Sequence, residues 1–427
     1  MKNINTILLP QLLLASPGLA AASSDTKLKL EDPAYVDAVI DGYIERETFP
    51  FVYVRLEDLE GRVIYEHSAI NDELMGGMKI DGDSWIRIWS MSKAVTISVV
   101  LDLVEDGTLS LTDRVVDYIP EFSDLQVAAL ERAPDLSLAQ GTEDACPFET
   151  VPMQYGMTLL DLLNHRGGFY YPNTGVDCLD ETAFEADLPT ARNSQDLIDR
   201  IATLPLVNQP GATAHYGVGT TVLGLVAERA TGKSLNQLVE ARVTGPFGIE
   251  GLRYGLPEGA ELPPHFTAKD GVLRKMDDDG PRIFGSELPG YDPESELYLG
   301  GEGMVATANG YADFARILLG RGELGGQRLL DESTIADLTA PHTQLDSEFG
   351  HNGYNLWISN GLYGDGEQGP GPLWIGGGYE GTHFWIDPQR GFVGVIMSQI
   401  FETSEDGWGR DENIRKAIYE QLETGGK

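Results

Sequence analysis

Both the architecture and the chemistry that we expect follow from one segment, Trp85-Ile86-Arg87-Ile88-Trp89-Ser90-Met91-Ser92-Lys93-Ala94-Val95-Thr96. Its first five residues are typical of a strand. From Met91 to Glu105 nearly every position is apolar, which is typical of a helix that is buried on all faces. A serine and a lysine three residues apart therefore stand where a strand leads into a buried helix.

The spacing of Ser90 and Lys93 suits nucleophilic catalysis. Residues three apart lie on one face of a helix, so the lysine amine can reach the serine hydroxyl. A lysine in a desolvated site loses its proton more easily and can act as a base. The alternative is a serine that caps a core helix whose lysine extends into solvent.

Other serine motifs in the chain are weaker. Ser24-Asp25-Thr26-Lys27 has the same spacing, but it lies in a polar segment where no buried site is expected, and we interpret it as chance. The G-x-S-x-G motif of α/β-hydrolases is absent, since Gly232-Lys233-Ser234-Leu235-Asn236 fails at its last position. The sequence therefore favours Ser90 as the nucleophile.

Strand patterns occur near both ends of the chain, with mostly helical signal between them. Residues 52–56 and 63–65 predict a hairpin, and residues 382–387 and 392–397 predict two strands joined by a turn. Helices are expected over residues 32–48 and 411–422. We therefore expect a mixed α/β fold with one antiparallel sheet flanked by helices. Residues 32–90 and 300–420 would form this part, and residues 108–300 a helical subdomain with long loops at 126–155 and 252–300.

Composition excludes several classes of function. The net charge is −37 with a pI near 4.3, and the acidic residues are spread along the chain, which argues against nucleic-acid binding. After the N-terminus no segment resembles a membrane span. The seven histidines are scattered and no H-E-x-x-H motif occurs, so no ligand set for a catalytic metal is visible. Acyl transfer through a serine needs no cofactor, and none is expected. A small-molecule substrate is the expected partner, and the oligomeric state is left open.

The N-terminus is typical of a signal peptide. Lys2 is followed by an apolar stretch over residues 7–19 and then by small residues at 20–22. We expect a signal peptide over residues 1–22, a mature domain over residues 23–427, and export to the periplasm or the medium. The alternative is a frayed cytosolic N-terminus. In an exported chain Cys146 and Cys178 could form a disulfide, and this is left open.

The nucleophile segment resembles that of the family VIII carboxylesterases, which are β-lactamase-related serine hydrolases of the penicillin-binding-protein superfamily. The resemblance covers about residues 32–420. The order and spacing of its segments make it specific. They lie at residues 87–96, 107–113, 118–122, 157–168, 210–211, 216–218, 222–224, 301–308 and 376–382. The resemblance implies a β-lactamase/transpeptidase-like fold.

The resemblance also implies roles for individual residues. Ser90 would attack the substrate carbonyl and become acylated, and Lys93 would be the base that takes its proton. Tyr216 would hydrogen-bond the nucleophile and relay a proton to the leaving group. The oxyanion hole would consist of the backbone N–H groups of Ser90 and Tyr379. The residues Gly376, Gly377 and Gly378 would let the substrate approach this backbone closely.

Two departures from the motifs of β-lactamases and D-alanyl-D-alanine peptidases bear on specificity. Val218 replaces the asparagine of Y-x-N, and Gly376-Gly377-Gly378 replaces K-T-G. In those enzymes the lysine of K-T-G helps to hold a substrate carboxylate. This chain lacks that lysine and is strongly acidic, so a neutral ester is the better match. Many of the esterases carry tryptophan where this chain has Gly376, which predicts a roomier acyl pocket.

Four further residues near the motifs bear on the site or its border. Tyr170 and the adjacent Tyr171 could line its mouth, with ordinary aromatic packing as the alternative. His383 could face the substrate, although alternate strand residues point to opposite faces. His165 is expected to order a turn beneath the site.

The sequence thus predicts a serine hydrolase that forms an acyl-enzyme on Ser90, most consistent with a carboxylesterase acting on neutral esters. One alternative is a D-amino-acid peptidase, an amidase or a weak class C-like β-lactamase. The alternative of another class is a non-catalytic exported protein that binds peptidoglycan or lipid. The presence of Ser90, Lys93 and Tyr216 together argues against that alternative.

Overall fold

The computed structural model describes residues 28–130, 146–276, 285, 291–344, 351–359, 372–401 and 407–422. The signal peptide expected over residues 1–22 lies outside these ranges, as does the second Ser-x-x-Lys copy at residues 24–27. Within the described ranges, no helix combines the length and the apolar character needed to cross a membrane.

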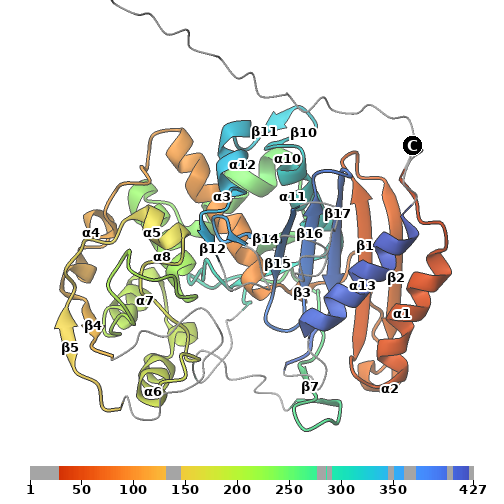
Figure 1. Cartoon of the computed structure of the whole chain (residues 1–427), viewed down its shortest axis with the longest axis horizontal. Helices are drawn as coiled ribbons and strands as arrows, with labels where there is room; N and C mark the ends of the chain where they lie inside the picture. The colour runs from red at the N-terminus through yellow and green to blue at the C-terminus, as the bar shows by residue number, and fades with distance from the viewer. Residues whose placement is uncertain are drawn as a thin grey trace, which may run out of the picture.

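A large antiparallel sheet joins the two ends of the chain. Its described part has eight strands in the order β12-β13-β14-β15-β16-β17-β1-β2. The first strand pairs with the last, so that Tyr53 lies opposite Met397 (Figure 1). The expected mixed α/β fold with an antiparallel sheet is confirmed. The strands are β1 (Phe51–Asp58), β2 (Val63–Ile70), β12 (Thr343–Gln344), β13 (His351–Asn352), β14 (Trp357–Ser359), β15 (Leu373–Gly377), β16 (His383–Asp387) and β17 (Phe392–Met397).

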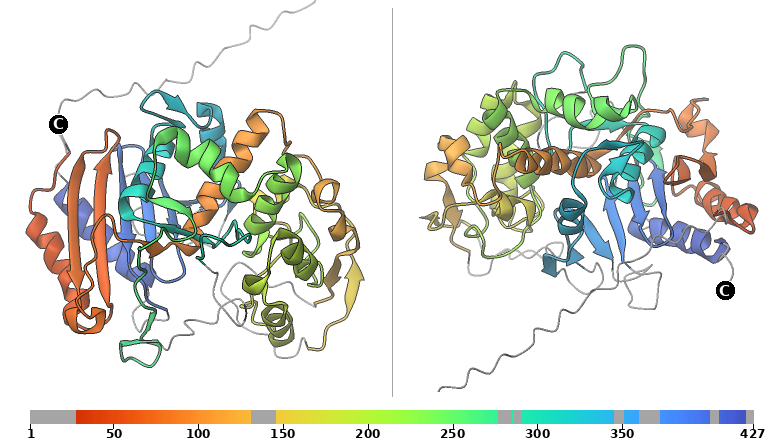
Figure 2. Two further views of the ribbon diagram at one scale, coloured as in Figure 1. Left: turned by 180° about the vertical axis from the view of Figure 1, so that it is seen from behind. Right: turned by 90° about the horizontal axis from the view of Figure 1, so that it is seen from above.

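Helices cover both faces of this sheet. On one face α1 (Pro33–Glu45) packs against α13 (Gly407–Gln421), and on the other α11 (Ala308–Leu319) packs against β17 (Figure 2). Every residue of β16 and β17 is therefore buried. Because strand residues alternate between faces, His383 contacts α13 whereas its neighbour Phe384 contacts α11.

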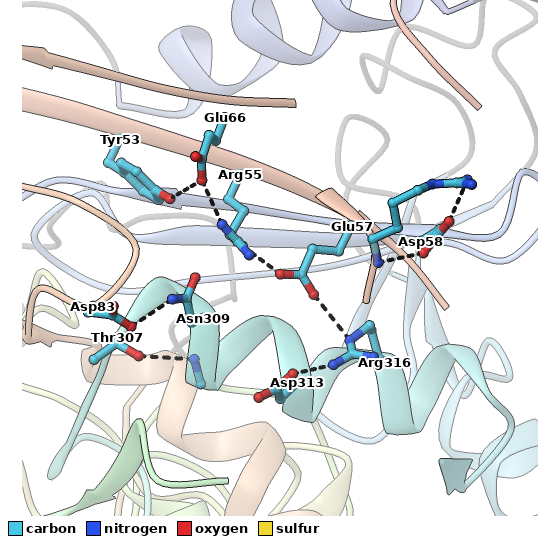
Figure 3. Close-up of polar contacts among 12 residues, drawn as sticks. Tyr53, Arg55, Glu57, Asp58, Glu66, Asp83, Thr307, Asn309, Asp313 and Arg316 are labelled. Carbon is cyan, nitrogen blue, oxygen red and sulfur yellow. Dashed lines mark hydrogen bonds and ion pairs between the residues drawn. The ribbon is translucent and has the colours of Figure 1, made fainter. Parts of the chain in front are cut away.

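A buried ion network fixes α11 to the sheet (Figure 3). Glu57 of β1 accepts a hydrogen bond of 2.5 Å from Arg55 Nε and lies 3.1 Å from Arg316 Nε of α11. Glu57 is only 3% exposed, and Arg316 also pairs with Asp313. Removing one partner would leave an unpaired buried charge, so this network specifies how the helix docks on the sheet.

The middle of the chain forms a helical region beside the sheet, drawn in yellow and green in Figure 1. Its longest described helix is α8 (Gly219–Thr231), which packs against the buried helix α3 (Ser92–Glu105). The helix α3 lies between the two parts of the molecule, which explains why its residues are apolar on nearly every face. The region also includes α4 (Val115–Tyr118), α5 (Leu159–Leu163), α6 (Asp177–Ala186), α7 (Ser194–Ile201), α9 (Leu235–Val239) and α10 (Gly245–Phe247).

The two stretches expected to be loops contain short strands. In the second stretch β6 (Leu252–Tyr254) joins β9 (Met304–Ala306) and β3 (Ile86–Arg87) in a small sheet. Propensity alone misses such three-residue strands, because pairing with distant partners stabilises them. The remaining small elements are α2 (Asp72–Met75), α12 (Glu332–Leu338), and the hairpins β4 (Gln126–Ala128) with β5 (Thr150–Pro152), β7 (Phe266–Thr267) with β8 (Arg274–Lys275), and β10 (Glu323–Leu324) with β11 (Gln327–Arg328).

The two cysteines, whose pairing the sequence left open, form a disulfide. Cys146 and Cys178 are bonded across a separation of 32 residues. The bond ties the segment that follows β4 to the helix α6, beside a small apolar cluster that includes Tyr170 and Leu179.

Candidate active site

The nucleophile candidate lies in a tight turn at the start of the buried helix. Ser90 occupies a single 3₁₀ turn, Trp89–Met91, which leads directly into α3. The strand before it, expected over residues 85–89, is only Ile86–Arg87, because Trp89 adopts a left-handed conformation with φ 46°. Lys93 follows one helical turn later, and its Nζ lies 3.2 Å from Ser90 Oγ.

Lys93 is enclosed rather than extended into solvent. The residue is only 2% exposed. Its Nζ lies 2.9 Å from the carbonyl oxygen of Gly301 and 2.9 Å from the hydroxyl oxygen of Tyr171. A side chain at position 301 would place its Cβ 3.1 Å from Lys93 Nζ, which is tighter than most real Cβ contacts, so glycine leaves room for this close approach. The alternative of a solvent-exposed lysine on a core helix is thereby excluded.

Glu302 is a site residue to which the sequence reasoning gave no role, although the segment 301–308 carried part of the resemblance. It is 3% exposed, and its Oε1 lies 3.9 Å from Lys93 Nζ. It accepts hydrogen bonds from the Tyr171 hydroxyl and, at 2.8 Å, from Thr221 Oγ1. A glutamate between two glycines gave no periodic signal, and only the folded chain brings it to Lys93.

Tyr171 connects Lys93 with Glu302. Burial, the nearby negative charge of Glu302, Tyr216 and the hydrogen bond to Glu302 raise the pKa of Tyr171 well above its usual value of 10.0. The phenol therefore stays protonated, donates its hydrogen to Glu302, and offers its oxygen to Lys93. The sequence analysis expected Tyr171 at the mouth of the site, but in the structure it is buried at the bottom of the site, beside Lys93.

Tyr216 completes the group beside Lys93. The ring centroid of Tyr216 lies 4.9 Å from Lys93 Nζ and 5.5 Å from the ring centroid of Tyr171. The two tyrosines come from segments that cross at Gly217, where a Cβ would lie 2.4 Å from the Phe169 carbonyl oxygen. Ser90, Lys93 and Tyr216, which the sequence singled out together, therefore line one cavity.

His165 packs beneath this group. It stands in a left-handed conformation with φ 56°, and its ring centroid lies 4.9 Å from that of Tyr216. Burial, the positive charge of Lys93 and His215 lower the pKa of His165 to about 3. A neutral, buried imidazole supports the Tyr216 ring, in keeping with a role in ordering the turn.

The cavity at Ser90 is small, and Phe384 closes one side of it. Gly376 of β15 lies opposite Phe384 of β16, and a Cβ on Gly376 would come within 2.2 Å of the Phe384 ring. The expectation of a roomier acyl pocket at Gly376 is therefore wrong, because the ring from the neighbouring strand occupies that space. The described lining consists of Ser90, Lys93, Ala94, Tyr216, Asn355, Leu356, Trp357, Gly376, Gly377 and Phe384.

The turn after β15 docks on the nucleophile segment. A Cβ on Gly378 would lie 2.4 Å from the Ile88 carbonyl oxygen, so this glycine allows close contact between two protein segments rather than access for a substrate. The next residue, Tyr379, is 47% exposed, and its ring centroid lies 6.1 Å from that of Trp89. The backbone proposed for the oxyanion hole thus lies beside the residue that precedes Ser90.

Two residues expected to contact substrate lie elsewhere. Tyr170 is 3% exposed in the apolar cluster with Leu179, whose carbonyl oxygen lies 3.4 Å from its hydroxyl. Successive residues of an extended segment point in opposite directions, so Tyr171 enters the site and Tyr170 leaves it. His383 is fully buried on the other face of the sheet, with its Nε2 2.6 Å from Arg415 Nη1 of α13.

These elements define a class of protein. A serine at the start of a buried helix, a lysine one turn later, a tyrosine from the helical region and a β-strand along the opposite side are the arrangement of the serine β-lactamase and penicillin-binding-protein superfamily. Lys93 and its neighbours come from segments far apart in the chain, since Lys93 bonds to Tyr171 and Gly301 across 78 and 208 residues.

Comparison with known proteins agrees with this class. A model of the β-lactamase family matches residues 59–418. Protein Rv1367c of Mycobacterium tuberculosis is 29% identical over 294 residues, 68% of each chain, and the lovastatin esterase of Penicillium rubens is 29% identical over 272 residues, 61% of each chain. The structure of simvastatin synthase from Aspergillus terreus superimposes with a TM-score of 0.71 at 22% identity, and the match covers 92% of this chain and 100% of the synthase. The chain belongs to the β-lactamase family, and it is a serine hydrolase.

Proposed function

We propose that this protein is a carboxylesterase that hydrolyses small neutral esters through an acyl-enzyme on Ser90. One observation carries the proposal, namely the buried Lys93 amine 3.2 Å from Ser90 Oγ. This amine donates two hydrogen bonds, to the carbonyl oxygen of Gly301 and the hydroxyl oxygen of Tyr171, and each oxygen lies 2.9 Å from Lys93 Nζ. In the neutral amine the remaining direction holds the lone pair, which is then available to the Ser90 hydroxyl.

Acylation follows from this arrangement. Lys93 takes the proton of the Ser90 hydroxyl while the oxygen attacks the ester carbonyl. The new positive charge on Lys93 lies 3.9 Å from the Glu302 carboxylate, which compensates it. The backbone N–H groups of Ser90 and Tyr379 would bind the oxyanion. When the carbon–oxygen bond breaks, the Tyr216 hydroxyl protonates the departing alcohol and regains a proton from Lys93.

Deacylation repeats these steps with water as the acceptor. Water attacks the acyl-enzyme and passes a proton toward Tyr216 and Lys93, and Ser90 leaves with a proton to restore the free enzyme. Charges and protons balance over the cycle, so no further reactant is needed.

The lining of the cavity supports a neutral substrate. Among the described residues that line it, Lys93 is the sole basic side chain, and the partners above already engage it. The segment Gly376-Gly377-Gly378 offers no lysine for a carboxylate, and the net charge of −37 opposes the approach of anions. The esterase name of a relative that is 29% identical also favours this substrate class.

The test compares three substrates on one preparation. We expect hydrolysis of p-nitrophenyl acetate, no turnover of a chromogenic cephalosporin, and labelling by a fluorophosphonate that disappears in Ser90→Ala. Glu57→Gln, in the ion network between β1 and α11, is the control for a buried substitution outside the site. It should keep both labelling and hydrolysis. Hydrolysis confined to D-amino-acid amides would replace the esterase proposal with an amidase. A wild-type protein without labelling would favour the non-catalytic binder.

A further inference from the structure

Glu380 is a buried acid that the mechanism above does not use. The residue is 0% exposed and follows Tyr379 directly in the turn that docks on the nucleophile segment. Burying a carboxylate is costly unless hydrogen bonds compensate for the lost hydration. Its surroundings therefore indicate what the acid is for.

Three side chains donate hydrogen bonds to this carboxylate. Trp89 Nε1 and Gln399 Nε2 lie 2.8 Å and 2.6 Å from its Oε2. His265 Nδ1 lies 2.6 Å from its Oε1. An indole N–H and an amide NH₂ can only donate, so the two groups that share Oε2 need an acceptor at that position. A carboxylate, which has only acceptors, satisfies all three at once.

The indole that Glu380 binds belongs to the strained residue next to the nucleophile. Trp89 has φ 46°, and a left-handed conformation is sterically unfavourable for a residue with a Cβ atom. Such a conformation persists only where the surroundings hold it. Trp89 is fully buried, its ring packs against Tyr379, and its one polar side-chain atom is bonded to Glu380.

Glu380 also anchors the turn that contains Tyr379. Its carbonyl oxygen accepts a hydrogen bond of 2.9 Å from the backbone N–H of Ile400, three residues after the end of β17. The side chain of Gln399 in turn accepts a bond of 3.2 Å from the backbone N–H of Arg87 in β3. One residue therefore links the strand before the nucleophile, the nucleophile turn and the Tyr379 turn.

We propose that Glu380 is a positioning residue that sets the relative placement of the Ser90 and Tyr379 backbone N–H groups. The inference rests on the proposed function, since it assigns those two groups to the oxyanion hole. Glu380 has no exposed surface, so it acts through its neighbours and not on the substrate directly. It holds Trp89 in the left-handed conformation that orients Ser90, and it holds the turn on the opposite side of the hole.

Two substitutions at Glu380 separate hydrogen bonding from charge. In Glu380→Gln the amide oxygen can face Trp89 and Gln399 while its NH₂ faces His265, whose Nδ1 then accepts in the other tautomer. This conservative variant keeps the bond to Trp89. Glu380→Leu fills the space but leaves the indole N–H without that acceptor. Trp89→Phe removes the donor alone and serves if Glu380→Leu fails to fold.

The measurements are kcat and KM for p-nitrophenyl acetate together with the Tm. We expect kcat to fall roughly 100-fold in Glu380→Leu and about 10-fold in Trp89→Phe, with KM within about twofold, because misplaced oxyanion donors act on the transition state. Glu380→Gln should stay within about threefold of wild type. Glu57→Gln changes another buried carboxylate, in the ion network, and should lower Tm but leave kcat unchanged.

Failure of the inference can be told from failure of the proposed function. A wild type that hydrolyses the ester, with kcat in Glu380→Leu and Trp89→Phe equal to wild type, would overturn the inference alone. A wild type without esterase activity would overturn the proposed function. In that case the crystal structure of Glu380→Leu tests whether Glu380 sets the positions of the Ser90 and Tyr379 backbone N–H groups. It should show Trp89 out of the left-handed region and the Tyr379 turn displaced from Ser90. Unchanged positions of both would refute the role of Glu380.

Discussion

Replacing Tyr171 with phenylalanine removes one oxygen atom from the centre of the site and leaves the ring in place. That oxygen accepts a hydrogen bond from Lys93 at 2.9 Å and donates its hydrogen to Glu302. Tyr171 is 5% exposed, so water cannot easily take its place. A hydrogen bond to a charged group contributes about 1.5–3 kcal/mol, and the Glu302 carboxylate is such a partner of this hydroxyl.

We expect Tyr171→Phe to lose about 2–3 kcal/mol in the free energy of unfolding. The loss stays below the sum of two bonds because Lys93 and Glu302 remain 3.9 Å apart and can pair more closely. Lys93 keeps the Gly301 carbonyl and Ser90 as neighbours, so kcat should fall only about 10-fold. Tyr216→Phe should lower kcat by about 10²–10³-fold with little change in stability, because it removes the proton relay.

Urea unfolding and steady-state hydrolysis of p-nitrophenyl acetate measure the two quantities on the same variants. Tyr216→Phe is the matched control, since it removes a hydroxyl from the neighbouring ring, 5.5 Å away. The reasoning would be refuted by the opposite pattern, in which Tyr171→Phe abolishes hydrolysis without loss of stability and Tyr216→Phe stays active. Tyr171 would then be the relay, and Tyr216 a packing residue.

Two further changes test the acyl site and the buried histidine. Phe384→Val should widen the space above Gly376 and raise the ratio of kcat/KM for p-nitrophenyl octanoate over acetate about 10-fold, at a cost of about 2 kcal/mol in stability; an unchanged ratio would show that Phe384 does not limit the acyl group. Burial lowers the pKa of His165 to about 3 from 6.5, so the unfolded chain binds more protons between these values and stability falls as pH drops below 6.5. Between pH 7 and pH 5 the wild type should lose about 2 kcal/mol more than His165→Asn in urea unfolding, and equal losses in both chains would contradict this cause.

Local patterns in the sequence predicted the four strands β1, β2, β16 and β17 and the nucleophile helix, but not the strands β12 to β15 of the same sheet. Alternation at residues 52–56 and apolar runs at residues 392–397 gave strands that the structure has as β1 and β17. The helix expected from Met91 to Glu105 is Ser92–Glu105. These predictions succeed because the spacing of apolar residues shows which face of a strand or helix is buried. That spacing can be seen within a few neighbouring residues of the sequence.

The surroundings of Lys93 could not be predicted in the same way. Tyr170 and Tyr171 are adjacent and identical in type, and only the crossing of their segment at Gly217 decides which ring enters the site. Glu302 meets Tyr171 across 131 residues, and Phe384 fills the space at Gly376 from the neighbouring strand. The periodicity of neighbouring residues carries no information about contacts between residues so far apart in the sequence.

The order of its motifs gave this chain its family, its fold class and a serine–lysine pair one helical turn apart, because helix geometry joins residues that are close in sequence. Tertiary structure alone decided which tyrosine bonds to the lysine, which acid balances its charge, how small the acyl cavity is, and how Glu380 holds Trp89. Those features depend on side chains from separate elements that meet in a close-packed interior, where orientation and volume are set by the whole fold.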